Sequence, residues 1–262
     1  MTIEDRKSAV EILGDAGADA GPALILCEHA SHRIPARYHD LGLAPQHAES
    51  HAAWDPGARA LGLHLAAALA SPMVASTVSR LVYDCNRPPE AASAMPEKSE
   101  LIEVPGNRGL SPDDRAERVH SVYAPFCEAV TAQIAARQQR GHSTALITVH
   151  SFAPVYFGKQ RAVEIGILHD TDKRLADAML ALAPKLPHRK IERNEPYGPA
   201  DGVTHSLQIH GIAQRLPNVM IEVRNDLLRT PEDIARIGDE LLTMIGPALV
   251  HLGLQSQGAA HA

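Results

Sequence analysis

The sequence of 262 residues lacks the features that mark exported, membrane-spanning or nucleic-acid-binding proteins. Its three cysteines, Cys27, Cys85 and Cys127, form no Cys-x-x-Cys pair, which argues against a disulfide framework and a thiolate zinc site. No apolar run approaches the roughly 18 residues that cross a membrane, and the first residues do not form a signal peptide. A formal net charge of -6 leaves no basic surface for nucleic acid or acidic lipid. We therefore expect a cytoplasmic protein that acts on a small molecule, and its oligomeric state stays open.

Apolar residues make up 45% of the chain, enough to bury a sizeable core. We expect one domain over residues 1–262, with a core from about 21 to 250 and flexible termini. Short apolar runs alternate with segments of helical period, a pattern typical of α/β proteins with a mixed or largely parallel sheet. The predicted strands are 23–27, 73–78 leading to 81–83, 145–149, 163–168 and 219–223. The predicted helices are 58–70, 111–141, 170–182, 201–215 and 234–245.

Several helices have clear start signals, in which an oxygen-bearing residue precedes a proline. Asp55, Ser111 and Thr230 stand in this position. Pro125 lies inside the long helical segment and should kink or divide it, because proline has no N–H to donate. Residues 88–110 predict a long loop, and long loops in compact domains are often functional.

Charged and imidazole side chains stand at the ends of the predicted strands. Glu28 and His29 follow the first, Asp84, Asn86 and Arg87 follow 81–83, His150 follows 145–149, and Glu222 lies within the last. Ligands of open α/β sheets bind outside the carboxyl ends of the strands, so these residues can converge there. A catalytic zinc site needs two or three imidazole or carboxylate ligands and one open position, which two histidines and one acid supply.

Each of these residues also has a structural interpretation. A buried histidine is often only hydrogen-bonded, Asp55 can cap the helix that follows it, and Glu222 can pair with Arg224. As a functional group, a desolvated Glu222 suits a general base. Cys27 beside Glu28 and His29 is a weak candidate nucleophile, because a cysteine within an apolar strand is usually inert. The absence of a Gly-x-Ser-x-Gly sequence weakens a serine-hydrolase interpretation.

Three segments resemble motifs of zinc carboxypeptidases, in the same order along the chain. VYDCNR (82–87) is similar to their substrate-carboxylate motif, ITVHSF (147–152) to their metal-histidine strand, and IEVR (221–224) to their catalytic glutamate strand.

A fuller match is to the N-formylglutamate amidohydrolase family, which shares that hydrolase fold. The segments that carry this resemblance are EHASHRIP (28–35), HAAWDPGA (51–58), SRLVYDCNRPP (79–89) and HSFAP (150–154). The resemblance implies a three-layer α/β sandwich around a mixed, largely parallel sheet, as in zinc carboxypeptidases. It also implies one zinc ion, or another divalent metal, and hydrolysis of N-formyl-L-glutamate by attack of metal-bound water.

The family's functional residues can be carried over residue by residue. The resemblance implies His29 and His150 as zinc ligands, Glu222 as general base, Arg80 as the group that polarises the scissile carbonyl, and Asn86 and Arg87 as holders of a substrate carboxylate. Ser151 and Arg224 complete the predicted substrate-binding set, and Arg161 is a further candidate for the glutamate side chain.

The sequence departs from the carboxypeptidase pattern at the second metal ligand. The spacing that holds a glutamate there gives His32 here, so we predict Asp55 as the acidic ligand, with His32 as the alternative. Better-known family members carry Pro-His-Ser-Gly where this chain has EHAS (28–31), which indicates a divergent branch. Alternative functions are a peptidase or deacylase with another small substrate, or a carboxylate-binding protein without catalysis.

Overall fold

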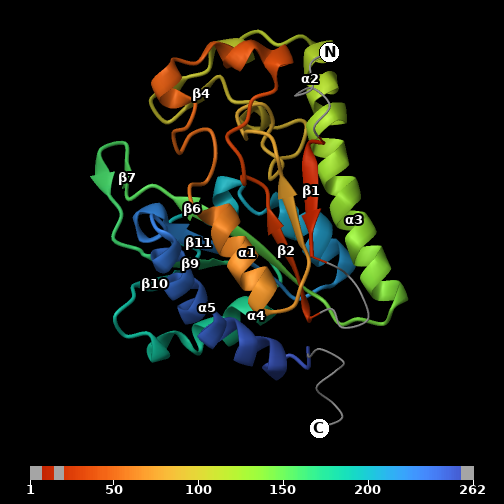
Figure 1. The fold of residues 1–262 in the computed structure, drawn as a ribbon, viewed down its shortest axis with the longest axis vertical. Helices are drawn as coiled ribbons and strands as arrows, with labels where there is room; N and C mark the ends of the chain where they lie inside the picture. Colours follow the sequence, from red (N-terminus) through yellow and green to blue (C-terminus); the bar gives the residue numbers. More distant parts are fainter. Residues whose placement is uncertain (1–7, 15–20, 255–262) are drawn as a thin grey trace.

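A mixed sheet of seven strands forms the centre of the computed structural model, which describes residues 8–14 and 21–254 (Figure 1). The strand order is β1-β3-β2-β6-β11-β9-β10. The strands are β1 (Val10–Leu13), β2 (Ala23–Cys27), β3 (Met73–Ser76), β6 (Ala145–Phe152), β9 (Ile165–Leu168), β10 (Ile191–Arg193) and β11 (Asn218–Arg224). Two small hairpins lie outside it, formed by β4 (Lys98–Ser99) with β5 (Ile102–Glu103) and by β7 (Val155–Tyr156) with β8 (Lys159–Gln160).

The sheet is largely parallel, as the sequence predicts. Strands β3, β2, β6 and β11 run parallel to one another, whereas β1 pairs antiparallel with β3 and β9 pairs antiparallel with β11. The sequence did not predict β1 or β10, and both lie at the edges of the sheet. Most residues of the termini that we expect to be flexible lie outside the described ranges, whereas 8–14 contain β1 and 251–254 contain the end of α5.

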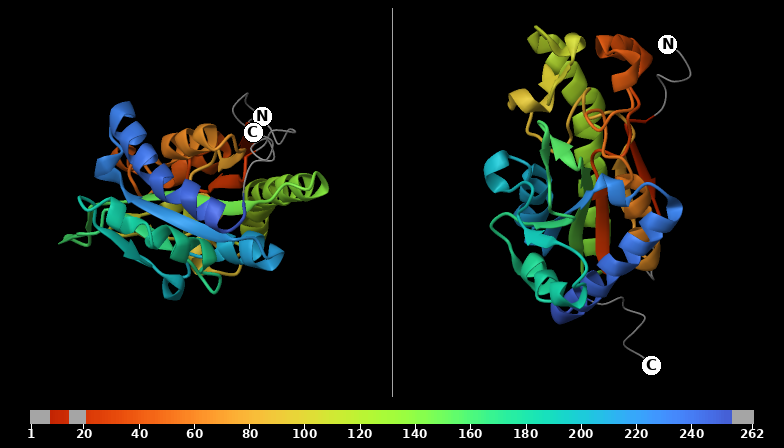
Figure 2. Two further views of the ribbon diagram at one scale, coloured as in Figure 1. Left: turned by 90° about the horizontal axis from the view of Figure 1, so that it is seen from below. Right: turned by 90° about the vertical axis from the view of Figure 1, so that its left-hand side faces the viewer.

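Helices cover both faces of the sheet and give three layers (Figure 2). On one face, α1 (Ala58–Ala68), α4 (Arg174–Leu180) and α5 (Pro231–His251) pack on alternate apolar residues of the central strands. On the other, α3 (Ala124–Gln139) packs with buried loop residues on the remaining positions of β2 and β6. Burial on both faces explains why the central strands are continuously apolar. The predicted fold class is confirmed.

The apolar run at 81–83 is not a strand, contrary to prediction. The hydroxyl of Ser79 accepts a hydrogen bond from the N–H of Leu81, and the carbonyl of Ser79 accepts one from Val82. These bonds close a turn, and the apolar side chains are buried in the core on the α3 face. The run therefore indicated burial correctly and extended structure wrongly.

The helical segment near Pro125 is divided, as predicted. Helix α2 (Pro112–Arg118) leads into a π-helical turn at Val119–Tyr123, and α3 follows from Ala124. The N–H of Ala124 bonds to the carbonyl of Val119, five residues back. Because Pro125 donates no N–H, the wider turn just before it replaces a regular one.

Other predicted elements differ in length. Strand β6 continues to Phe152, so His150 lies inside the strand. The helix predicted at 201–215 contains a π-helical turn at Leu207–Gly211 followed by a 3-10 turn. The 3-10 turns are Ala36–Gly42, Pro45–His47, Ala92–Ala94, Pro105–Asn107, Ala183–Lys185, Pro199–Asp201, Ile212–Gln214 and Asn225–Leu227. Within the ranges given above, no helix has the length and apolar character needed to cross a membrane.

Gly57 makes the sharp turn between Asp55 and α1. It is the N-cap of α1 with a φ of 83°, in the left-handed region that favours glycine. A Cβ at this position would lie 2.5 Å from Cβ of Leu228. Both the backbone conformation and the packing therefore require glycine.

We expect Gly57→Ala to lower the free energy of unfolding by about 1–3 kcal/mol, because alanine pays for the left-handed conformation and also collides with Leu228. Urea unfolding followed by circular dichroism measures the loss. Gly109→Ala is the matched control, since Gly109 has a φ of 63° but no atom within 4 Å of the added Cβ. Equal losses in the two variants would contradict the packing part of this explanation.

Candidate active site

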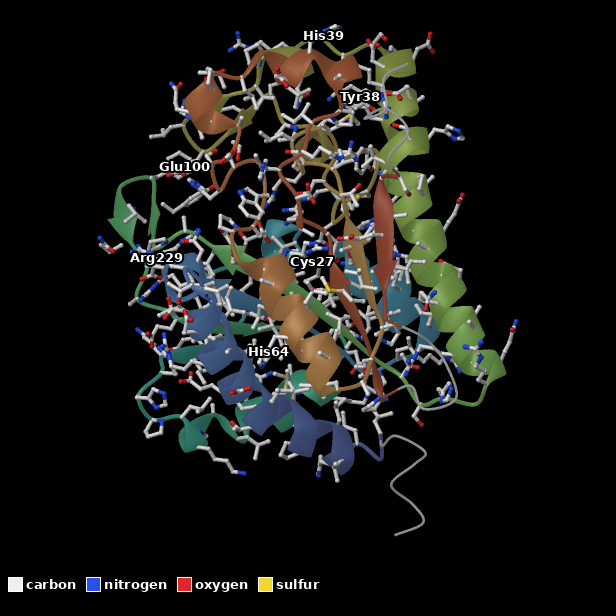
Figure 3. All side chains as sticks on the ribbon, in the orientation of Figure 1. Cys27, Tyr38, His39, His64, Glu100 and Arg229 are labelled. Carbon is white, nitrogen blue, oxygen red and sulfur yellow. The ribbon has the colours of Figure 1, made fainter. Side chains whose placement is uncertain are left out.

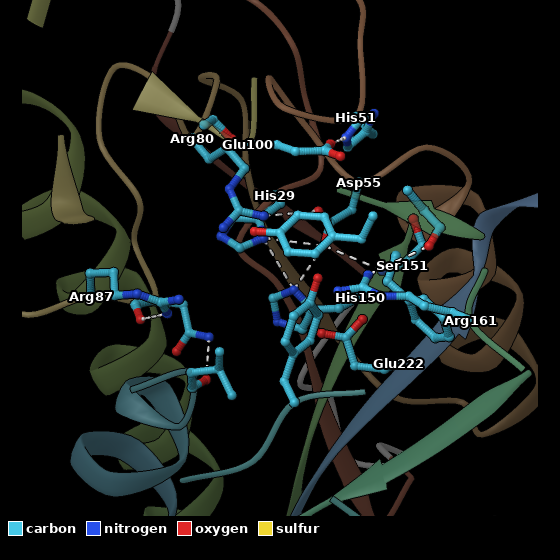
Figure 4. Close-up of a pocket in the computed structure, with 17 residues that line it drawn as sticks. His29, His51, Asp55, Arg80, Arg87, Glu100, His150, Ser151, Arg161 and Glu222 are labelled. Carbon is cyan, nitrogen blue, oxygen red and sulfur yellow. Dashed lines mark hydrogen bonds and ion pairs between the residues drawn. The ribbon is translucent and has the colours of Figure 1, made fainter. Parts of the chain in front are cut away.

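The side chains of His29, His150 and Glu222 meet at the carboxyl ends of neighbouring strands. His29 follows β2 by two residues, and His150 and Glu222 are register partners on β6 and β11. All three line one pocket, together with Asp55 and Arg80 (Figure 4). The parallel strands bring these residues together from distant parts of the sequence, at the sheet edge where α/β proteins commonly bind ligands.

Three ligand atoms of this group surround a common centre. Oδ2 of Asp55 lies 3.1 Å from Nδ1 of His29 and 2.9 Å from Nδ1 of His150, and the two Nδ1 atoms are 3.2 Å apart. All three side chains are buried. In a tetrahedral zinc site with bonds of about 2.0–2.2 Å, neighbouring ligand atoms lie roughly 3.4 Å apart. The donor types and spacings therefore fit one divalent ion.

Neither alternative for Asp55 agrees with its surroundings. The N-cap of α1 is Gly57, without a side-chain cap bond, so the Asp55 carboxylate does not cap the helix. His32, the alternative candidate for the third metal ligand, has a side chain that is 42% exposed. Its ring packs edge-on against Trp54, away from the three converging atoms.

The far nitrogen of each histidine also meets a carboxylate. Nε2 of His29 lies 2.7 Å from Oδ1 of Asp84, and Nε2 of His150 lies 3.2 Å from Oε2 of Glu28. Metal-binding histidines commonly donate the other ring N–H to a carboxylate, which fixes the tautomer and the orientation of the ring. This second set of carboxylates strengthens the fit to a metal ion.

Arg80 connects two of the carboxylates. Its Nη1 lies 3.3 Å from Oδ1 of Asp55, and its Nη2 donates to Oδ2 of Asp84 at 2.9 Å. Burial alone raises the pKa of Asp84, but His29 and Arg80 outweigh it and hold that pKa well below its usual value. Arg80 is therefore fixed at the wall of the pocket beside the ligand group.

Glu222 is buried beside this group without a cation of its own. Its side chain makes no ion pair within the described residues, so the alternative pairing with Arg224 is not found, and its Oε2 has no hydrogen-bond partner there. Burial raises the pKa of Glu222 to about 7, and the charge of Asp55 adds to the effect. A carboxylate with this pKa exchanges protons readily near neutral pH.

Two further arginines line the pocket without a carboxylate partner in the described part of the chain. Arg87 donates Nη1 to the carbonyl of Asn86 at 2.8 Å. The guanidinium of Arg161 stands over the rings of Tyr156, Tyr197 and Phe152, at 4.3, 4.7 and 5.6 Å from their centroids. Figure 4 shows the two arginines on opposite sides of His150.

Asn86 and Ser151 line the pocket but are engaged with the protein. The side-chain amide of Asn86 donates to the carbonyl of Val203 at 2.6 Å and accepts from the N–H of Ser206 at 2.9 Å. The hydroxyl of Ser151 donates to the carbonyl of Pro56 at 2.8 Å. Both residues brace the walls of the pocket, and their contact with substrate stays a prediction.

Arg224 is not placed at the pocket, contrary to our expectation for a substrate ligand. Its Nε donates to Asp226 at 2.7 Å, and its Nη1 donates to the carbonyl of Arg161 at 3.2 Å. Arg224, the last residue of β11, therefore binds the 3-10 turn that follows this strand. Its effect on the pocket is indirect, through the backbone of Arg161.

The sequence did not identify the residues that cover the pocket. Glu100, in the turn between β4 and β5, accepts a hydrogen bond from the N–H of Phe157 at 2.7 Å and lies 2.9 Å from Nε2 of His51. It thereby joins three loops, beside the β7–β8 hairpin (Figure 3). The unusual length of loop 88–110 was the only signal of this role. Tyr197, which precedes the 3-10 turn at Pro199–Asp201, also lines the pocket.

Comparison with known proteins agrees with this geometry. The model of the N-formylglutamate amidohydrolase family matches residues 21–229. The chain belongs to this family. The resemblance inferred from the sequence is thus confirmed, and the family is one of hydrolases that act on amides.

Solved structures extend the likeness to most of the chain. A gene product from Agrobacterium tumefaciens is 48% identical, with a TM-score of 0.91, over 95% of this chain and 98% of that one. The N-formylglutamate amidohydrolase from Ralstonia eutropha is 19% identical, with a TM-score of 0.67, over 94% of this chain and 100% of that one, and carries the fold alone. No curated protein matches the chain.

The surroundings of Cys27 exclude this residue as the alternative nucleophile. Cys27 is fully buried in β2, and burial, followed by the charges of Asp55 and Glu28, raises the pKa of its thiol well above the usual value. A thiol in this state does not form the reactive thiolate.

We expect the protein to bind about one zinc ion per chain, because three buried ligand atoms surround one centre. Asp55→Asn should weaken zinc binding strongly, whereas His32→Ala should leave it unchanged. Metal content after dialysis and competition with a chelator measure both effects. If His32→Ala weakened zinc binding and Asp55→Asn left it unchanged, His32 would be the third ligand.

Proposed function

We propose that this protein hydrolyses the formamide of N-formyl-L-glutamate to formate and glutamate, with zinc or another divalent ion held by His29, Asp55 and His150. The observation that carries the proposal is the convergence of these three ligand atoms beside the buried, unpaired carboxylate of Glu222, in a chain of the N-formylglutamate amidohydrolase family. Nucleophilic attack by a cysteine has no support in this site.

The chemistry divides between the ion and the side chains. A divalent ion bound by these ligands would supply a Lewis acid and lower the pKa of water. Glu222 takes a proton from the attacking water and returns it to the nitrogen of glutamate as the C–N bond breaks. A pKa of about 7 suits both transfers, because the group can accept and then donate a proton near neutral pH.

Arg80 stabilises the negative charge that develops on the formyl oxygen. Asp55 and Asp84 hold its guanidinium at the wall of the pocket, so its position requires little reorganisation during the reaction. A preorganised donor of this kind commonly contributes about 10²–10³ to the rate.

Arg87 and Arg161 support a substrate with two carboxylates. Both line the pocket, and neither is neutralised by a carboxylate within the described residues. Arginine suits bidentate binding of carboxylates. We assign the α-carboxylate of glutamate to Arg87 and its side-chain carboxylate to Arg161, whose position is limited by the aromatic rings around it.

The decisive experiment combines metal analysis of the purified protein with a formate-release assay on N-formyl-L-glutamate. Release that disappears with a chelator and returns with zinc supports the proposal. Bound zinc without formate release would assign the same site to another N-acyl amino acid or a small peptide, and a panel of such compounds would identify it. Absence of both metal and release would indicate a binding protein.

Glu222→Gln should reduce kcat about 10²–10⁴-fold and leave KM little changed, because the amide keeps the shape of the side chain and cannot accept the proton. In the wild type, kcat/KM should rise with pH as Glu222 ionises, since it accepts a proton only in that form, and a neighbouring divalent ion would place this rise below the metal-free pKa of about 7. Steady-state kinetics from pH 5 to 9 test both expectations. Glu232→Gln, on the exposed first turn of α5, is the control. If Glu222→Gln kept the wild-type kcat, Glu222 would have no part in the mechanism.

Arg161→Gln should raise KM for N-formyl-L-glutamate and shift preference towards N-formyl-L-glutamine, because the amide lacks the charge that the arginine binds. The ratio of kcat/KM for the two substrates measures this shift. Arg174→Gln removes an exposed arginine outside the pocket and should leave the ratio unchanged. If the ratio of kcat/KM for the two substrates were unchanged in Arg161→Gln, another residue would bind the side-chain carboxylate of the substrate.

A further inference from the structure

Glu28 is a buried carboxylate that the proposed reaction does not use. It follows β2 directly, and its residue is only 1% exposed. Neither of its oxygens has a hydrogen-bond partner among the described residues. Burying a carboxylate is costly unless nearby donors or cations compensate its charge.

The nearest partner of Glu28 is the far side of the metal-ligand candidate His150. Oε2 of Glu28 lies 3.2 Å from Nε2 of His150, the ring nitrogen that faces away from the converging ligand atoms. No lysine or arginine lies within ion-pair distance of Glu28 in the described part of the chain. Its negative charge interacts chiefly with His150, and less with the hydroxyl of Ser206 and with His29.

Asp84, on the other histidine, differs in this respect. It contacts Nε2 of His29 at 2.7 Å, but it also accepts hydrogen bonds from Arg80 and from the N–H of Asn86. Its charge is shared with an arginine, whereas the ion pair of Glu28 among the described residues is with His150. Glu28 is thus placed to affect His150 more strongly than its longer distance alone indicates.

We propose that Glu28 is a positioning residue of the metal site, which accepts the Nε2 proton of His150 and so keeps Nδ1 free to bind the ion. The inference rests on the proposed metal-dependent function. A histidine that donates its far N–H to a carboxylate is fixed in tautomer and ring orientation, and its free nitrogen becomes a stronger donor.

This role and a purely structural role predict different results. If Glu28 serves the metal, its replacement weakens metal binding in a metal-free protein that still folds. If Glu28 only stabilises the fold, its removal destabilises the metal-free protein. Metal affinity and metal-free stability therefore separate the two roles without an activity assay.

The test compares the wild type with Glu28→Gln, which keeps a hydrogen-bond acceptor without the charge, and Glu28→Leu, which has neither. Zinc affinity is measured by competition with a coloured chelator, and thermal unfolding is followed on the metal-free proteins. We expect zinc affinity to fall about 10–100-fold, more in Glu28→Leu than in Glu28→Gln, in metal-free proteins that still fold. Glu240→Gln, on α5 and paired with Arg189, is the control and should bind zinc as the wild type does.

Unchanged zinc affinity in both Glu28 variants would overturn the inference and leave the proposed function intact. A fall in the metal-free midpoint with unchanged zinc affinity, or a failure of both variants to fold, would assign Glu28 to the fold and also overturn it. If the wild type itself bound no divalent ion, the proposed function would fail first, and the inference with it.

Discussion

The structure depends on how it compensates negative charge in its interior. Glu28, Asp55, Asp84 and Glu222 are all buried at one edge of the sheet, and Arg80 is the arginine that pairs with two of them. Uncompensated buried carboxylates cost several kcal/mol each. His29 and His150 contact three of these carboxylates beside Arg80, and a divalent ion among the converging ligand atoms would add positive charge. Protonation of Glu222 lowers the negative charge further. The charge balance and the proposed chemistry thus lead to the same site.

Strands and loops have different tasks in this site. His150 and Glu222 lie on central strands, whose backbones are fixed by hydrogen bonds on both sides. Arg87, Arg161 and Glu100 lie on connecting segments that cover the pocket. Residues that need a constant spacing are therefore carried by the rigid part of the fold. Residues that recognise the substrate are carried by segments that tolerate change more easily.

The sequence predicted the central strands, the edge of the sheet at which the site lies, and most of the candidate site, because buried strands and strand-end polar residues leave strong local patterns. It failed where structure depends on distant contacts. The turn at 81–83 is closed by Ser79, and the short edge strand β10 has little apolar pattern of its own. The contact between Glu28 and His150, 122 residues apart, depends on the pairing of β2 with β6, which a local pattern does not contain.

The register of β6 and β11 also makes assembly of the site an all-or-none event. His150 and Glu222 stand opposite each other in the ladder, so their separation follows the spacing of about 4.8 Å between neighbouring strands. A slip of one residue would replace Glu222 by Ile221 or Val223 and turn the carboxylate to the opposite face of the sheet. Chains that refold with such a slip would retain nearly all their secondary structure and have no site, so circular dichroism would count them as native while an active-site titration would not.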